Sequence, residues 1–203
     1  MVQIGTFAPQ GWRLELRGIA GAAAQWARTK SVAKELERLG YDSLWLYDHF
    51  HTVPRTEIEP TFECWTTMAA LAEATSRIRL GQLVTCALYR NPAYLAKISS
   101  CVDVISGGRV DVGLGAGWKE DEFTAYGYDF GTLRSRLDRM ADTARILRAM
   151  WTEERATVHH VRSITFGPSR DVARFPHTHH LMTRDRILLR DAGHARHRRV
   201  PGD

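Results

Sequence analysis

An alternation of strand-like and helix-like segments constrains the fold of this chain more than any other feature. Between residues 2 and 151, short apolar runs alternate four times with segments that carry apolar residues at spacings of three and four. This order predicts a parallel sheet with right-handed crossovers, either an open doubly wound sheet or part of an eight-stranded barrel. The predicted strands are residues 2–8, 43–47, 78–85 and 110–115, and the predicted helices are residues 23–39, 61–75, 91–106 and 131–151.

The first predicted strand is nearly all apolar, so we expect it to be buried on both faces. Residues 119–129 are polar and predict a loop. In both architectures the chemistry belongs at the carboxyl ends of the strands. These ends carry the least ordinary residues of the chain, and they are Phe7–Gln10, Asp48–His51, Gln82–Ala87 and Gly113–Trp118.

The last predicted strand lacks side chains on one face from Gly113 onward, because Gly113, Gly115 and Gly117 alternate with other residues. A bare strand face lets another group lie close to the backbone. That group is either a protein side chain or a planar cofactor ring, and the glycines alone do not decide between them. Their spacing does not match the dinucleotide-binding fingerprint.

Composition places the chain among ordinary globular proteins. It has 203 residues, of which 44% are hydrophobic and 25% charged, and we expect one main domain. No apolar run is long enough to span a bilayer, and the N-terminus does not resemble a secretion signal. The three cysteines have neither a disulfide pattern nor metal-ligand spacing, so we expect a cytoplasmic protein without a metal.

The net charge of +5 comes from the C-terminal part of the chain. Residues 156–203 contain nine Arg, four Asp and seven of the nine His, but no Lys. The rest of the chain is neutral, with 19 basic and 19 acidic residues. The main domain therefore lacks the charge of a nucleic-acid-binding protein.

Four motifs stand in order along residues 2–155. At these motifs the chain resembles the luciferase-like monooxygenase superfamily, and it is most similar to the coenzyme F420-dependent oxidoreductase branch, which is typical of actinobacteria. Four ordered motifs are a more specific signal than any one of them. The motifs are Tyr47–Phe50, Tyr89–Lys97, Asp103–Arg109, and Gly115–Trp118 with the following Glu122 and Tyr126–Gly127.

The resemblance implies an α/β fold of the (β/α)8 TIM-barrel type, of which residues 1–157 would form about the first four β/α units. It also implies that F420 lies at the C-terminal face and exchanges hydride with a small organic substrate at its deazaflavin C5. His49 would be the catalytic residue beside the reacting centre, since an imidazole holds or releases a proton near neutrality. Without the resemblance, a structural hydrogen bond would be the favoured role of His49. Asp48 would touch the deazaflavin.

Further cofactor contacts follow from the resemblance. A non-prolyl cis peptide between Gln82 and Leu83 would back the deazaflavin, and the Thr85 hydroxyl would bond its edge. Thr85 is equally typical of an ordinary strand residue. The remaining implied contacts are Gly115, Ala116, Gly117 and Asp121, with Glu122 beside Asp121 as either a contact or a first-turn helix acid. Sugar-phosphate-oxidising relatives have a glutamate where this chain has Trp118, which argues against that substrate class.

Residues 158–203 form a basic tail in which we do not recognise the family pattern. A truncated or out-of-frame gene, a basic arm for nucleic acid or acidic lipid, and a His-rich metal site at residues 177–180 all remain open. We expect the tail to be poorly ordered and place no site there; only Arg186–Leu189 suggests a short helix or strand. Four barrel strands would leave two unpaired edges, so we expect a homodimer if the chain folds.

The sequence therefore predicts an F420-dependent oxidoreductase with a small-molecule substrate and no membrane or nucleic-acid partner. One alternative is an FMN-dependent luciferase-like monooxygenase. The other is a non-catalytic fragment or a basic binding protein.

Overall fold

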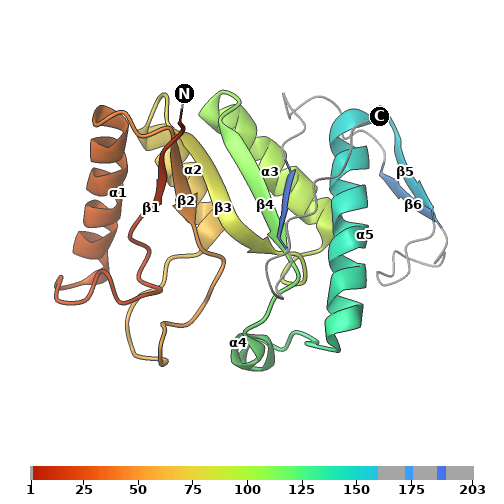
Figure 1. Cartoon of the computed structure of the whole chain (residues 1–203), viewed down its shortest axis with the longest axis horizontal. Coiled ribbons are helices and arrows are strands. Elements are labelled where there is room, and N and C mark those ends of the chain that lie inside the picture. Colours follow the sequence, from red (N-terminus) through yellow and green to blue (C-terminus); the bar gives the residue numbers. More distant parts are fainter. Residues whose placement is uncertain (1, 160–171, 176–186, 191–203) are drawn as a thin grey trace.

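The structure is a computed structural model that describes residues 2–159, 172–175 and 187–190. Its main element is a parallel five-stranded sheet in the order β1-β2-β3-β4-β7, and β5 and β6 form a separate antiparallel pair (Figure 1). The predicted α/β class is confirmed. The strands are β1 (Gly5–Phe7), β2 (Ser43–Leu46), β3 (Arg79–Cys86), β4 (Val110–Gly115), β5 (Ala156–His159), β6 (Val172–Phe175) and β7 (Ile187–Arg190). The helices are α1 (Ala22–Arg38), α2 (Cys64–Ala74), α3 (Pro92–Ser106), α4 (Glu120–Ala125) and α5 (Leu133–Thr152).

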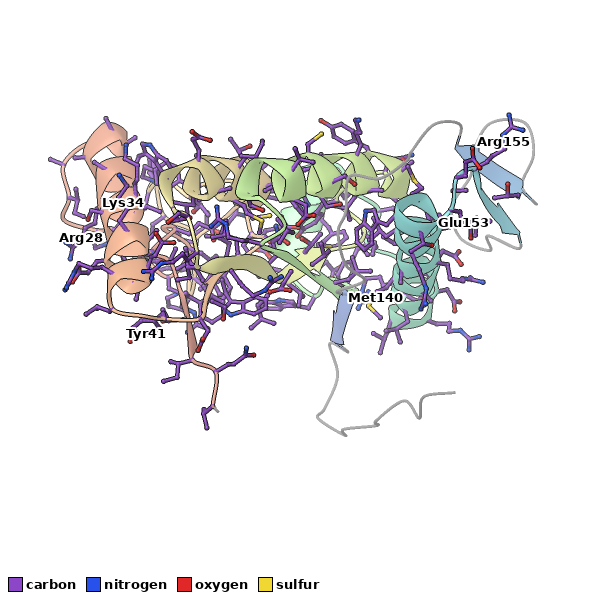
Figure 2. The ribbon with its side chains drawn as sticks, turned by 90° about the horizontal axis from the view of Figure 1, so that it is seen from above. Arg28, Lys34, Tyr41, Met140, Glu153 and Arg155 are labelled. Carbon is purple, nitrogen blue, oxygen red and sulfur yellow. The ribbon has the colours of Figure 1, made fainter. Side chains whose placement is uncertain are left out.

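The long helices cover one face of the sheet. Figure 2 shows α2 and α3 along this face, with α1 at one end of the row and α5 at the other. The core lies between these helices and the strands, and burying each large apolar side chain contributes roughly 1.5–3 kcal/mol. Its fully buried members include Leu44, Leu46, Leu80, Val112 and Leu114 from the strands and Met68, Leu71, Leu95, Ile146 and Leu147 from the helices.

Helix α3 shows how local sequence sets the element boundaries. The Asn91 side chain accepts hydrogen bonds from the N–H groups of Ala93 and Tyr94, at 2.9 and 3.3 Å. Pro92 occupies the first helical turn, where its missing N–H costs nothing. Gly107 ends the helix in the left-handed conformation, with φ of 69°. The predicted start and stop of this helix are confirmed.

The opposite side of the sheet, which we call the inner face, carries no helix within the described residues. Residues opposite each other in parallel strands share a face, so Gly81 and Asp111 lie together on the inner face while Leu80 and Val110 face the helices. The Trp45 ring fills the space beside Gly81, where an added Cβ would come within 2.5 Å of it.

Two predicted elements differ from the structure. Strand β1 is shorter than the predicted residues 2–8, and Gly5 in it is exposed. The residues before it are not buried either, since Val2 is 86% and Ile4 57% exposed. In the described part of the chain β1 pairs only with β2, which leaves its other edge open. The polar segment 119–129 is not all loop, because it contains α4.

The centre of β3 also departs from the prediction by one residue. The non-prolyl cis peptide joins Leu83 and Val84, not Gln82 and Leu83. Pairing with β4 shifts between Gln82 and Thr85, so this is where the strand bulges.

Strand β7 extends the four predicted strands to five. It lies parallel to β4 with Val112 opposite Ile187, so β4 is an inner strand of the sheet. The sheet keeps two edge strands in the described residues, β1 and β7, in agreement with the prediction of two unpaired edges. A short element near residues 186–189 was predicted and is confirmed as this strand.

Residues 158–159 and 172–175 of the proposed tail lie in β5 and β6. Residues 160–171, 176–186 and 191–203, which include 177–180, lie outside the described residues. Their predicted disorder and the boundary at residue 157 stay predictions. No helix in the described ranges is long and apolar enough to cross a membrane.

Candidate active site

The loops that follow β1, β2 and β4 meet at one end of the sheet, where Figure 1 also shows α4. Each loop contributes one aromatic ring to a cluster of Trp12, His49 and Trp118. His49 stacks on Trp12 with ring centroids 4.3 Å apart and an interplanar angle of 5°. Trp118 meets the same imidazole edge-on at 5.7 Å. The predicted convergence of the strand ends is therefore confirmed for His49 and the segment after the glycine run.

The imidazole of His49 is held by a carboxylate. Its Nδ1 lies 2.8 Å from Oε2 of Glu122, and its side chain is 13% exposed. Within the described residues, Nε2 of His49 has no hydrogen-bond partner. The face-on and edge-on rings of Trp12 and Trp118 limit how this imidazole can turn.

Glu122 is fully buried in the first turn of α4. Its Oε1 accepts the N–H groups of Phe50 and His51, both at 2.9 Å, and its Oε2 also accepts the Tyr89 hydroxyl at 3.1 Å. Burial raises the pKa of the Glu122 carboxyl, but the hydrogen bonds from His49, His51 and Phe50 outweigh burial and lower the pKa below its usual value. Glu122 is therefore an ionised side chain that ties α4 to the loop after β2.

Asp48 points away from this imidazole into the protein. Arg90 donates two hydrogen bonds to its carboxylate, at 2.7 and 2.9 Å, and the Cys86 N–H donates a third at 2.8 Å. The Cys64 thiol lies 3.2 Å from the same carboxylate. The side chain thus connects three segments, and its implied contact with the deazaflavin stays a prediction that this geometry does not support.

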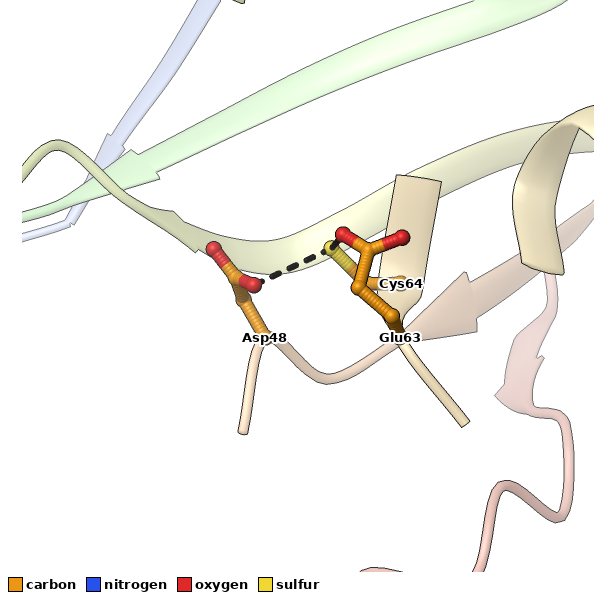
Figure 3. Close-up of side chains that lie close together, drawn as sticks. All are labelled: Asp48, Glu63 and Cys64. Carbon is orange, nitrogen blue, oxygen red and sulfur yellow. Dashed lines mark hydrogen bonds between the residues drawn. The ribbon is translucent and has the colours of Figure 1, made fainter. Parts of the chain in front are cut away.

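Asp48, Glu63 and Cys64 together form the kind of cluster that binds metal ions, and Figure 3 shows their side chains converging. The Arg90 guanidinium already supplies the positive charge at this place, since it also reaches Glu63 at 2.6 Å. Burial raises the pKa of the Cys64 thiol, which disfavours the thiolate that a metal needs. The cluster is best explained as a salt-bridged joint.

Gln82 and Thr85 lie on the helix-covered face of β3. Gln82 is opposite Val112 and its amide contacts Met68 of α2 at 3.3 Å, while Thr85 is opposite Leu114 and fully buried. Their side chains therefore do not line the inner face. The residues between them, Leu83 and Val84, are half-buried.

The glycines of β4 and the following loop make room for protein atoms. A Cβ at Gly113 would lie 2.2 Å from the Gln82 carbonyl oxygen, and one at Gly115 would lie 2.5 Å from the Val84 side chain. Gly117 has a φ of 74° and is packed against Phe123. Of the two interpretations open from the sequence, the structure supports close packing by side chain and backbone at these positions.

The remaining predicted contacts separate in space. Ala116 is fully buried, whereas Asp121 is exposed and forms an ion pair with Lys119. Trp118 is 57% exposed beside His49. These positions do not test direct contact with a cofactor, and their predicted cofactor roles stay predictions.

Sequence reasoning gave no role to three of the residues that build this site, and it did not foresee the contact of Glu122 with His49. Trp12 stacks on His49, Tyr89 bonds the Glu122 carboxylate and Arg90 bonds that of Asp48. Glu122 was expected as a cofactor contact or a first-turn helix acid, and it bonds His49. Tyr89 and Arg90 belong to one of the four motifs, which is the signal that could have identified them.

Known proteins match the chain over most of its length. A family model described as luciferase-like monooxygenase matches residues 2–184, and so continues beyond residue 157. The F420-dependent hydroxymycolic acid dehydrogenase of Mycobacterium tuberculosis is 34% identical over 139 residues, which are 67% of this chain and 38% of that protein. Pyrimidine monooxygenase RutA of Stutzerimonas stutzeri is 32% identical over 170 residues, which are 76% of this chain and 44% of that protein.

Solved structures agree on the fold. An F420-dependent secondary alcohol dehydrogenase in complex with an F420-acetone adduct matches 94% of this chain and 52% of its own, with a TM-score of 0.68 and 24% identity. The chain thus spans 38–52% of the length of these three proteins and forms part of a TIM barrel of their kind. The family match covers most of the sequence, and the chain belongs to the luciferase-like monooxygenase family.

Proposed function

We propose that this chain carries part of an oxidoreductase site that transfers hydride between coenzyme F420 and a small organic substrate. The observation that carries the proposal is His49, held by the buried Glu122 between two indole rings at the C-terminal end of the sheet. The choice of cofactor is supported by a relative that is named as an F420-dependent dehydrogenase.

The residues at this end of the sheet fit a flat ring. Trp118 is exposed, and the half-buried Leu83 and Val84 lie on the bulge of the neighbouring strand. Bound F420 would supply a carbon that takes up or returns hydride. His49 would accept a proton from the substrate when hydride moves from the substrate to F420. It would return that proton when hydride moves the other way. Trp12 and Trp118 would fix the imidazole plane and exclude water from it.

A second candidate is an FMN-dependent monooxygenase of the same family. The relative named as a pyrimidine monooxygenase favours it, because its identity to this chain is close to that of the F420-dependent relative. The two candidates differ in which cofactor the folded chain binds.

Titration of the full 203-residue chain with F420, and separately with FMN, tests the proposal by the fluorescence of each cofactor. We expect F420 to bind more tightly than FMN. With a panel of small alcohols and bleaching of oxidised F420 as the assay, His49→Gln should lower the rate by about 10²-fold or more, as loss of a proton-transferring group does.

His51→Gln is the matched control, since His51 lies in the same loop and only its backbone contacts Glu122. Its rate should stay near that of the unchanged chain. Tighter binding of FMN would favour the monooxygenase. A folded chain that binds neither cofactor would overturn both assignments and support the non-catalytic alternative.

A further inference from the structure

We propose that Glu122 is a positioning residue that keeps the proton of His49 on Nδ1, so that the lone pair on Nε2 is left to receive a proton from the substrate. Only the use of that lone pair rests on the proposed function. The tautomer itself is a property of the chain and can be measured without any cofactor.

The hydrogen bonds of Glu122 determine the direction of its contact with His49. An ionised carboxylate only accepts hydrogen bonds, so every partner of Glu122 must donate. Phe50 and His51 donate backbone N–H groups to Oε1, and Tyr89 donates its hydroxyl to Oε2. The remaining contact, from Nδ1 of His49 at 2.8 Å, therefore requires a hydrogen on Nδ1.

The ionisation of both neighbours supports this direction. The pKa of Glu122 lies below its usual value, because its hydrogen bonds outweigh burial. Burial raises the pKa of the Tyr89 hydroxyl, so this group keeps its proton and donates it to the carboxylate. The imidazole thus faces the negatively charged carboxylate of Glu122, whose other hydrogen-bond partners are all donors.

The geometry of the ring leaves Nε2 as its available atom. Trp12 covers one face of the imidazole at 4.3 Å, and Trp118 meets it edge-on at 5.7 Å. In the part of the chain that the structure describes, no group bonds Nε2, although the side chain is 13% exposed. A neutral imidazole with hydrogen on Nδ1 has its lone pair on Nε2.

Side-chain ¹⁵N NMR of the full chain tests the proposal, because protonated and bare ring nitrogens resonate far apart. Spectra are recorded over a pH series until the ring is neutral, and the His49 signals are identified by their loss in His49→Gln. We expect the hydrogen on Nδ1 with a preference of about tenfold or more, as a charge-assisted hydrogen bond imposes.

Glu122→Gln should reverse the tautomer. The glutamine carbonyl can still accept the backbone N–H groups, while its NH₂ group donates to Nδ1 and moves the ring hydrogen to Nε2. Asp121→Asn is the matched control, since Asp121 is the neighbouring residue but is exposed and pairs with Lys119. It should leave the tautomer unchanged.

Two results would overturn the proposal. One is a hydrogen on Nε2 in the unchanged protein, and this measurement decides even if Glu122→Gln does not fold. The other is a folded Glu122→Gln variant with the same tautomer as the unchanged protein. Failure to bind F420 would contradict the proposed function and leave both NMR outcomes readable.

Discussion

Arg90 binds two of the carboxylates near the site. It forms ion pairs with Asp48 at 2.7 Å and with Glu63 at 2.6 Å. Burial lowers the pKa of its guanidinium, but the charge and hydrogen bonds of Asp48 outweigh this and raise it. Through these contacts Arg90 joins the loop after β3 to the loop after β2 and to the start of α2.

Replacing Arg90 with alanine should destabilise the protein by about 3–5 kcal/mol, because it leaves the Asp48 carboxylate buried without its partner. Urea denaturation measures the change. The matched control is Arg134→Ala, which removes an exposed pair with Asp138 and should cost less than about 1 kcal/mol. Equal losses in the two variants would show that Arg90 contributes no more than a surface charge.

At this scale the sequence predicted where Asp48 and His49 lie but not what each does. Consecutive side chains at a strand end turn in different directions, so one of the pair enters the protein and the other reaches the mouth of the sheet. The choice depends on Arg90, which is 42 residues from Asp48 in the sequence. No local pattern contains that information.

At the scale of elements, one carboxylate joins α1 to the bend that precedes β3. Glu37, in the last turn of α1, accepts the N–H groups of Ser76, Arg77 and Ile78 at 2.9, 2.6 and 2.9 Å. Burial raises the pKa of Glu37, but these backbone hydrogen bonds outweigh it and lower the pKa from 4.5 to about 2.

This lowered pKa predicts an acid-sensitive contribution to stability. Because the folded-state pKa lies below the unfolded one, the stabilisation is present above pH 4.5 and is lost as the pH falls toward 2. The urea midpoint of the unchanged protein should therefore fall over this range more steeply than that of Glu37→Gln. Glu73→Gln, on the exposed side of α2, should retain the steep fall. Parallel curves for Glu37→Gln and the unchanged protein would contradict the prediction.

Periodicity predicted the long elements well because their buried faces repeat. It missed α4, whose six residues are too few to show a repeat and whose inward side chains include the charged Glu122. The glycine run lies at the end of β4 as predicted, but the sequence did not show which atoms pack against it. At Gly113 and Gly115 those atoms belong to the bulge of β3. That bulge brings Val84 over Gly115 and appears only when both strands are seen.

In the part of the chain that the structure describes, helices cover one face of the sheet and not the inner face (Figure 2). On the inner face, Phe7 lies opposite Trp45 in register and stacks on Tyr47 with ring centroids 4.2 Å apart. All three side chains are only half-buried. Apolar rings gathered on one side of a sheet favour association with another surface.

We expect the chain to self-associate through this face. Sedimentation velocity over about a hundredfold range of protein concentration should show a concentration-dependent dimer. Trp45→Ser should weaken the association, whereas Trp118→Ser, which removes an exposed indole at the mouth of the sheet, should not. A monomer at every concentration would refute the expectation.

The brevity of β1 has a consequence for how a ring of strands could close around this half. In the described residues β1 and β7 are the two edge strands, so a ring of strands could close only if a further strand paired with β1. Strand β1 spans only Gly5–Phe7, three residues. Very few backbone hydrogen bonds could therefore form between β1 and that strand. Most of the stability of the closed ring would have to come from side chains that pack inside it.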